Sequence, residues 1–148
     1  MIKIPSLLFN IVVICCFTSI TVAAENIQIE TFKDWSVLRQ ETDAGRLCYI
    51  TSNPKEQKGD YDKDNRGSTR VFVSHGPGKA ERDVVSVVAG YSYKQQSDVE
   101  LNIDGNKQMF FTLGDRAWSL GPDEDKKVIR QMKRGTKLTI TGISSRGN

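Results

Sequence analysis

The sequence predicts a mainly β protein, an antiparallel β-sandwich with one short helix near its C-terminus. Three observations lead to this fold class. Short apolar runs with a period of two, typical of half-buried strands, recur between turn-forming residues. One stretch with helical periodicity follows them from residue 122. The chain beyond residue 24 has the length of one domain, so it can bury a core of its own.

The first 24 residues predict a secretory signal peptide. Lys3 provides a basic start, and an apolar stretch of roughly 12 residues follows. Signal peptidase needs small side chains at the last leader position and two before it, where Ala24 fits well and Val22 acceptably. We therefore expect cleavage between Ala24 and Glu25. The alternative, an uncleaved membrane anchor, would need about 20 strongly apolar residues. Residues 25–148 should then form a single domain without a stable membrane span.

The expected strands are bounded by glycine, proline and other turn formers. The run over residues 84–93 is the most hydrophobic and should form a central strand. Asp104 and Gly105 favour the positive φ angles of a tight hairpin turn. The strands are predicted over Ile27–Phe32, Trp35–Arg39, Leu47–Thr51, Arg70–His75, Val84–Tyr93, Val99–Ile103, Met109–Leu113, Arg116–Leu120 and Lys137–Ile143.

The helix is expected to begin at Pro122 and to end at Gly135. Three acidic residues follow the proline and place negative charge at the positive end of the helix dipole. Its apolar face consists of Val128, Ile129 and Met132. A polar loop over residues 55–67 has no aliphatic residue, so we expect it to bury nothing and to be mobile.

The charge distribution bears on possible partners, and the cysteine content bears on possible disulfides. The formal net charge is +3 and basic residues are interleaved with acidic ones, which gives no reason to expect a nucleic-acid partner. Cys15 and Cys16 belong to the leader, so Cys48 stands alone in the domain and cannot form a disulfide within it. Because Cys48 lies in an apolar run, we expect a buried core thiol.

No catalytic, metal or cofactor residue is predicted. The single histidine, His75, lies at a strand end, and metal sites built on histidine need further ligands. Asp60, Asp62 and Asp64 have the alternate spacing of a calcium loop, but the glycine and glutamate which that loop requires are missing. One enzyme hypothesis stays open, a secreted hydrolase that uses Cys48 or His75 as its reactive group.

Aromatic side chains suggest a different kind of site. Trp35, Trp118 and Tyr91 could form a platform for sugars, although aromatic residues in apolar strands more often pack in a core. A carbohydrate-binding module is therefore a second alternative function.

Several segments together resemble the invasion-associated locus B family of bacterial envelope proteins. They cover nearly the whole domain in the family's order and are most specific around Gly90 and Trp118. Trp35, Cys48, Gly90, Tyr91 and Trp118 form its structural fingerprint in this chain. The segments are Asp34–Val37, Cys48–Pro54, Val71–His75, Val84–Tyr91, Gly114–Trp118, Met132–Thr136 and Gly142–Gly147.

The resemblance implies an immunoglobulin-like β-sandwich in the periplasm or outer envelope of a Gram-negative bacterium. It also implies an unidentified envelope or host protein as partner, a link to host-cell invasion in pathogenic members, and no catalytic reaction or cofactor. The leading hypothesis is a non-enzymatic envelope protein that acts by binding or structural support. Relatives continue beyond the Ser-Arg-Gly segment into a further stretch. We therefore expect this domain, which stops at Asn148, to lack its final strand through truncation.

Overall fold

The computed structural model describes residues 26–62 and 64–147, so the expected cleavage site between Ala24 and Glu25 lies outside it. The described residues form nine strands, one α-helix and one 3-10 turn. The helix α1 spans Pro122–Arg134 and the 3-10 turn spans Lys79–Glu81. The strands are β1 (Asn26–Phe32), β2 (Trp35–Thr42), β3 (Gly45–Ser52), β4 (Arg70–His75), β5 (Val84–Val88), β6 (Val99–Ile103), β7 (Asn106–Leu113), β8 (Arg116–Trp118) and β9 (Leu138–Thr141).

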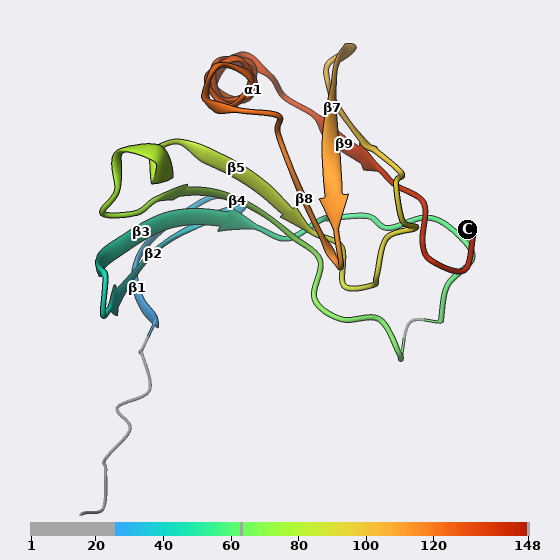
Figure 1. The fold of residues 1–148 in the computed structure, drawn as a ribbon, viewed down its shortest axis with the longest axis horizontal. Coiled ribbons are helices and arrows are strands. Elements are labelled where there is room, and N and C mark those ends of the chain that lie inside the picture. Colours follow the sequence, from blue (N-terminus) through green and yellow to red (C-terminus); the bar gives the residue numbers. More distant parts are fainter. Residues whose placement is uncertain (1–25, 63, 148) are drawn as a thin grey trace, which may run out of the picture.

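All strand pairings are antiparallel and join the nine described strands in the order β1-β2-β3-β4-β5-β8-β7-β6-β9. Helix α1 carries the chain from β8 in the interior of the sheet to β9 at its edge. Figure 1 shows β1 to β5 as a curved layer, α1 above β5, and β7 running across the direction of that layer. The mainly β fold with one helix near the C-terminus is thus confirmed. The immunoglobulin-like sandwich stays a prediction.

The core lies between one face of the sheet and α1. Val128 on α1 is fully buried, and Ile129 and Met132 pack against the same core, which confirms the predicted apolar face of the helix. The other buried apolar residues come from β4 to β8 and the segment after β5, and they are Val71, Val85, Val87, Ala89, Tyr93, Val99, Leu101, Ile103, Phe110 and Ala117. All seven residues of β1 are exposed, so its predicted half-buried pattern is wrong. The reason is its place at an edge of the sheet, far from the helix that covers β5.

The strand predicted over Val84–Tyr93 is wrong beyond Val88, where β5 ends. Gly90 adopts a φ of +73°, a left-handed conformation that interrupts an extended strand. Its carbonyl accepts a hydrogen bond of 2.8 Å from the Gly67 N–H, and a Cβ at position 90 would collide with the Gly67 carbonyl. The chain leaves the sheet at Gly90 because a distant backbone segment packs against it there.

The loop between β3 and β4 was expected to bury no side chain, and this is wrong for two of its residues. Tyr61 and Arg66 are both half-buried. The Arg66 guanidinium lies 4.4 Å from the ring centre of Tyr61 and 5.0 Å from that of Tyr91. Stacking between two rings stabilises a cation. These contacts fix the loop to the segment that follows β5. The prediction failed because it considered aliphatic side chains only, whereas the contacts are made by tyrosine and arginine.

The hairpin turn between β6 and β7 is confirmed. Asp104 and Gly105 have φ angles of 47° and 92°, the pair of positive values that a tight hairpin needs. The Asp104 carboxylate also accepts hydrogen bonds from the N–H groups of Thr136 and Lys137, at 2.7 and 3.0 Å. These bonds hold the pKa of Asp104 below its usual value. The turn thereby ties the chain that leaves α1 to the end of β6.

Asp125 has a second role besides the one predicted for it at the start of the helix. It is only 5% exposed, and its Oδ1 accepts hydrogen bonds from the Val85 N–H at 2.9 Å and the Ser119 hydroxyl at 2.7 Å. Burial raises the pKa of this carboxyl group, while the two hydrogen bonds act in the opposite direction. Asp125 therefore fastens the first turn of α1 to β5, in addition to standing at the positive end of the helix dipole.

Candidate binding surface

One face of the sheet carries a row of side chains that the strand register aligns across seven strands. Residues directly opposite each other in an antiparallel pair point to the same face. The row consists of Thr31, Ser36, Thr51, Phe72, Ser86, Trp118 and Phe111, in order from β1 to β7. We call the side of β2, β3, β4, β5, β8 and β7 that bears this row the open face. The core residues of these strands alternate with it and point to the opposite, covered face.

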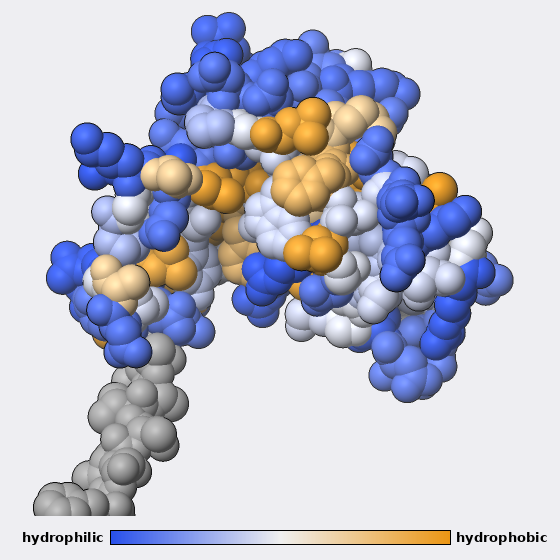
Figure 2. Space-filling model, in the orientation of Figure 1, coloured by the Kyte–Doolittle hydropathy of each residue, from blue (hydrophilic) through white to orange (hydrophobic). Residues whose placement is uncertain are grey.

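Aromatic side chains pack together on the open face. Phe111 and Trp118 are stacked with ring centres 5.7 Å apart, and Tyr49 and Phe72 are tilted against each other at 5.8 Å. Phe111 is 43% exposed, and Leu113, two residues further along β7, is 72% exposed. Figure 2 shows apolar side chains gathered in the middle of the molecule, around and beside the hollow between its two lobes. Large exposed apolar patches are rare on monomeric proteins and mark interaction sites.

Small residues separate the aromatic groups of this row. Thr51 lies between Ser36 and Phe72, and Ser86 lies between Phe72 and Trp118. Both residues are buried, although no helix covers this face of the sheet. The Thr51 hydroxyl donates a hydrogen bond to the Val71 carbonyl at 3.0 Å, so this buried group has a partner. The centre of the open face therefore excludes water locally and presents rings at its surface.

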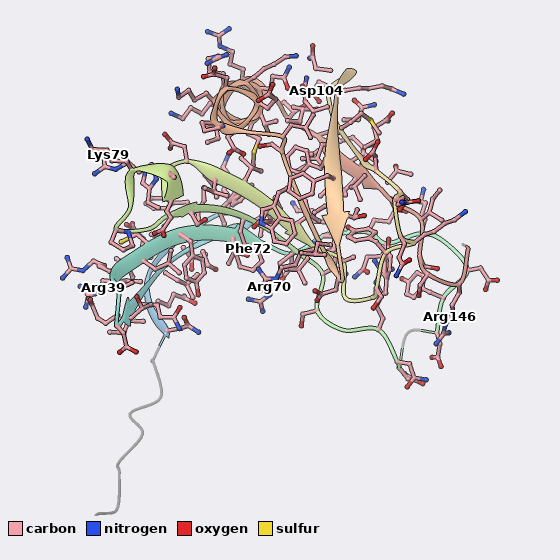
Figure 3. The ribbon with its side chains drawn as sticks, viewed as in Figure 1. Arg39, Arg70, Phe72, Lys79, Asp104 and Arg146 are labelled. Carbon is pink, nitrogen blue, oxygen red and sulfur yellow. The ribbon has the colours of Figure 1, made fainter. Side chains whose placement is uncertain are left out.

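Two arginines are the charged residues that β2 to β5 and β8 contribute to the open face. Arg70 and Arg116 lie opposite Val88, one on each side of β5. Neither forms an ion pair within the described residues, and the Nε of Arg70 is buried without a hydrogen-bond partner. In Figure 3, Arg70 and Phe72 of β4 lie near the centre of the molecule. The open face thus has aromatic rings next to two arginines that form no ion pair within the described residues.

The three aromatic residues proposed for carbohydrate binding do not come together. Trp118 lies on the open face, whereas Trp35 is the neighbour of Ser36 on β2 and packs against the core from the covered face. Tyr91 lies outside the sheet, where it meets Arg66 and the ring of Tyr93, 5.2 Å away. Burial raises the pKa of the Tyr91 hydroxyl. The sheet separates these groups, so they form no shared platform.

Cys48 and His75, the residues of the hydrolase hypothesis, lie opposite each other on β3 and β4. Cys48 is half-buried and lies outside the core cluster, so the expectation of a buried core thiol is wrong. It belongs to the part of β3 that α1 does not reach. Both nitrogens of the His75 imidazole contact Asp83. Its N–H donates to Nδ1 of His75 at 2.9 Å, and its carboxylate lies 3.5 Å from Nε2. The histidine is therefore oriented toward Asp83.

The acidic residues of the loop between β3 and β4 also have local partners. The Asp62 carboxylate accepts hydrogen bonds from the Asn65 side chain at 2.5 Å and the Asp64 N–H at 3.0 Å, which lower its pKa. Among the residues that the structure describes, no group of three histidine, cysteine, aspartate or glutamate side chains could hold a metal ion. No helix in the same part of the chain has the length and apolar content to cross a membrane.

Sequence reasoning missed most of the open face. Leu38, Tyr49, Phe72, Phe111 and Arg70 drew no functional interpretation, and only Trp118 was considered. The signal was present in the alternation of β4, where an arginine and a phenylalanine share the face opposite two valines. Reading both faces of each strand, rather than the aliphatic face alone, would have identified the residues.

The geometry defines a class, a mainly β protein with one covered sheet face and one exposed aromatic face. The chain belongs to the Invasion associated locus B (IalB) protein family, whose sequence model matches residues 35–148. The match begins at Trp35 and includes all five fingerprint residues, so the resemblance read from the sequence is confirmed. No curated protein and no solved structure matches the chain.

Proposed function

We propose that this protein is exported to the envelope of a Gram-negative bacterium and acts there by binding another macromolecule, without catalysing a reaction. The open face is the observation that carries the proposal, because it combines stacked rings, of which Phe111 is exposed, with the half-buried Arg70 and the exposed Arg116. Membership of the invasion-associated family is consistent with an envelope protein, and the leader supports export. The bent sheet, which changes direction at β7, is proposed to be a variant of the immunoglobulin-like sandwich (Figure 1).

The hydrolase alternative has one observation in its favour, since Cys48 and His75 are cross-strand neighbours. A cysteine nucleophile needs a base oriented toward its sulfur. Here both imidazole nitrogens face Asp83. The orientation of the imidazole toward Asp83 supports the binding proposal over this alternative.

Export is tested by expressing the full chain in a Gram-negative host and measuring the mass of the periplasmic protein. We expect an N-terminus at Glu25. Ala24→Phe serves as control, because the signal peptidase pocket admits only small side chains and the variant should keep its leader. Accumulation of the uncleaved protein in the cytoplasm would contradict export.

Binding is tested with a photocrosslinking amino acid at Leu113 in the protein expressed in its own host. We expect one discrete adduct that weakens in the Phe72→Ala background. The same crosslinker at Lys133, an exposed position on α1, should give no such adduct. Equal adducts at both positions, or none at Leu113, would count against the open face as the binding surface.

A further inference from the structure

We propose that the open face docks a polypeptide segment of a different protein, one that combines apolar side chains with carboxylates. The inference rests on the proposed binding function and specifies its partner. It follows from three properties of the open face, which are its residue types, its extent and its charge.

The large side chains of the open face are of the types found in protein–protein interface cores. Such cores are enriched in tyrosine, tryptophan, phenylalanine, methionine and arginine and depleted in lysine, aspartate, glutamate and serine. The serines of the open face lie between its large side chains. On β2 to β5 and β8 the open face has no lysine, aspartate or glutamate among the described residues. Its large side chains, with those that β7 adds, are Leu38, Leu47, Tyr49, Arg70, Phe72, Lys107, Met109, Phe111, Leu113, Arg116 and Trp118. Lys107, at the far end of β7, is paired with Glu100 at 3.0 Å.

The extent of the open face suits a macromolecule. From Leu38 on β2 to Phe111 on β7 the surface crosses five strand spacings, which is about 24 Å along the sheet. Apolar and aromatic groups occur along this whole distance, and Met109 at the far end is half exposed. A small ligand would leave most of that length in water, whereas an extended or helical segment of a protein would cover it.

The charge of the open face selects an acidic partner. Arg70 and Arg116 lie on the two strands that flank β5, so their backbones are about 10 Å apart. The buried Nε of Arg70 lacks a partner, and burial of a charged group stabilises a complex only when the charge is paired. Carboxylates on the incoming segment would supply that pairing, with the bidentate geometry that guanidinium groups favour.

The same charge argues against a second copy of this chain as the occupant. In a symmetric dimer each patch meets its own copy. Two open faces would bring four arginines together without a carboxylate from β2 to β5 or β8 to pair them. A different protein, with acidic residues at matching positions, fits the surface better.

The test uses three synthetic peptides of about 12 residues and the cleaved full-length protein, with binding measured by titration calorimetry. The first peptide combines leucine and phenylalanine with glutamate, the second replaces glutamate by lysine, and the third replaces the apolar residues by serine. We expect the first peptide to bind at least tenfold more tightly than the other two.

Charge reversal by Arg116→Glu gives the sharper result, because this exposed residue can change with little risk to folding. The variant should lose the acidic peptide and gain the basic one. Arg70→Gln is a second variant that should weaken acidic-peptide binding without reversing the preference. Arg130→Glu on α1 is the matched control, since it changes an exposed arginine away from the open face and should alter nothing.

The outcomes separate this inference from the proposed function. A Leu113 crosslink to another protein, together with peptide binding that ignores charge, would overturn the acidic partner and keep the binding function. A crosslink between two copies of this chain would overturn the different-protein partner. If no crosslink forms and no peptide binds, both the inference and the binding function fail.

Discussion

The two faces of the sheet are built from the same strands but differ in composition and in cover. Phe110 is 1% exposed on the covered face, whereas its neighbour Phe111 is 43% exposed on the open face. The covered face is mostly aliphatic, with valines on β4, β5 and β6 in the same core cluster as Val128 of α1. The open face is aromatic and bears arginine. The difference means that one face stabilises the fold, while the other stays partly exposed, as the proposed binding function requires.

The largest expected effect comes from truncating the two adjacent phenylalanines. Phe110→Ala should lower the free energy of unfolding by about 3–5 kcal/mol, because it leaves a cavity in the core. Phe111→Ala should cost about 1 kcal/mol, mainly the stacking with Trp118. Urea unfolding of both variants checks this. Equal costs would mean that the open face is covered in the isolated protein, and the contrast between the faces would be lost.

The next prediction concerns the close approach of the Gly90 and Gly67 backbones, which holds the loop between β3 and β4 against the end of the covered face. Gly90→Ala should destabilise the protein by about 2–4 kcal/mol, because the positive φ is strained for alanine and the new Cβ meets the Gly67 carbonyl. Gly114→Ala is the control. Its φ is +63°, and a Cβ added there would meet no atom within 4 Å apart from its chain neighbours, so only the backbone strain of about 1 kcal/mol applies. Thermal unfolding of both variants measures how much stability depends on the close approach of the two backbones.

Asp125 tests how α1 is fastened to the covered face. Asp125→Ala should cost about 1–3 kcal/mol, because the buried Val85 N–H and Ser119 hydroxyl lose their acceptor. Asp125→Asn keeps an acceptor oxygen and should cost less. Chemical denaturation of both variants at neutral pH compares them, and a larger loss in the asparagine variant would contradict the role of the acceptor.

The raised pKa of Asp125 also predicts a pH dependence. The folded protein binds the proton more tightly than the unfolded chain, so this group lowers the free energy of unfolding as pH rises from the unfolded pKa of 3.8 through the folded value. Asp62 and Asp104, with lowered pKa values, act in the opposite direction. The difference between wild type and Asp125→Asn isolates the Asp125 contribution. That difference should shift in favour of wild type on acidification, and a flat difference would contradict the raised pKa.

The smallest effect is expected at Cys48, on the part of the covered face that α1 does not reach. Its half-buried thiol should react with a thiol reagent more slowly than a cysteine at Leu120, which is 75% exposed, and faster than one at the buried Ala117. His75→Ala should leave the rate nearly unchanged, because the imidazole faces Asp83. Rapid labelling that disappears in His75→Ala would revive the hydrolase hypothesis.

Local patterns predicted much of the secondary structure. The bounds of β4 and β6 agree with the predicted runs, and α1 begins at Pro122 and ends before Gly135 as its cap signals indicate. The Asp104–Gly105 turn follows from the φ preferences of those two residues. These features depend on neighbours within a few residues along the chain. The candidate site was less predictable, because only the register across β4, β5, β8 and β7 aligns Phe72, Trp118 and Phe111.

The sequence by itself determined the family, the mainly β class, and the helix with its apolar face. These follow from short-range periodicity, capping residues and ordered motifs. Tertiary structure alone decided that β5 ends at Val88, that Asp125 is buried, and that Cys48 faces a histidine already held by Asp83. It also decided which face α1 covers. Alternation assigns residues to two faces, but one helix can bury only one of them, and its long-range packing determines that the aromatic face stays open.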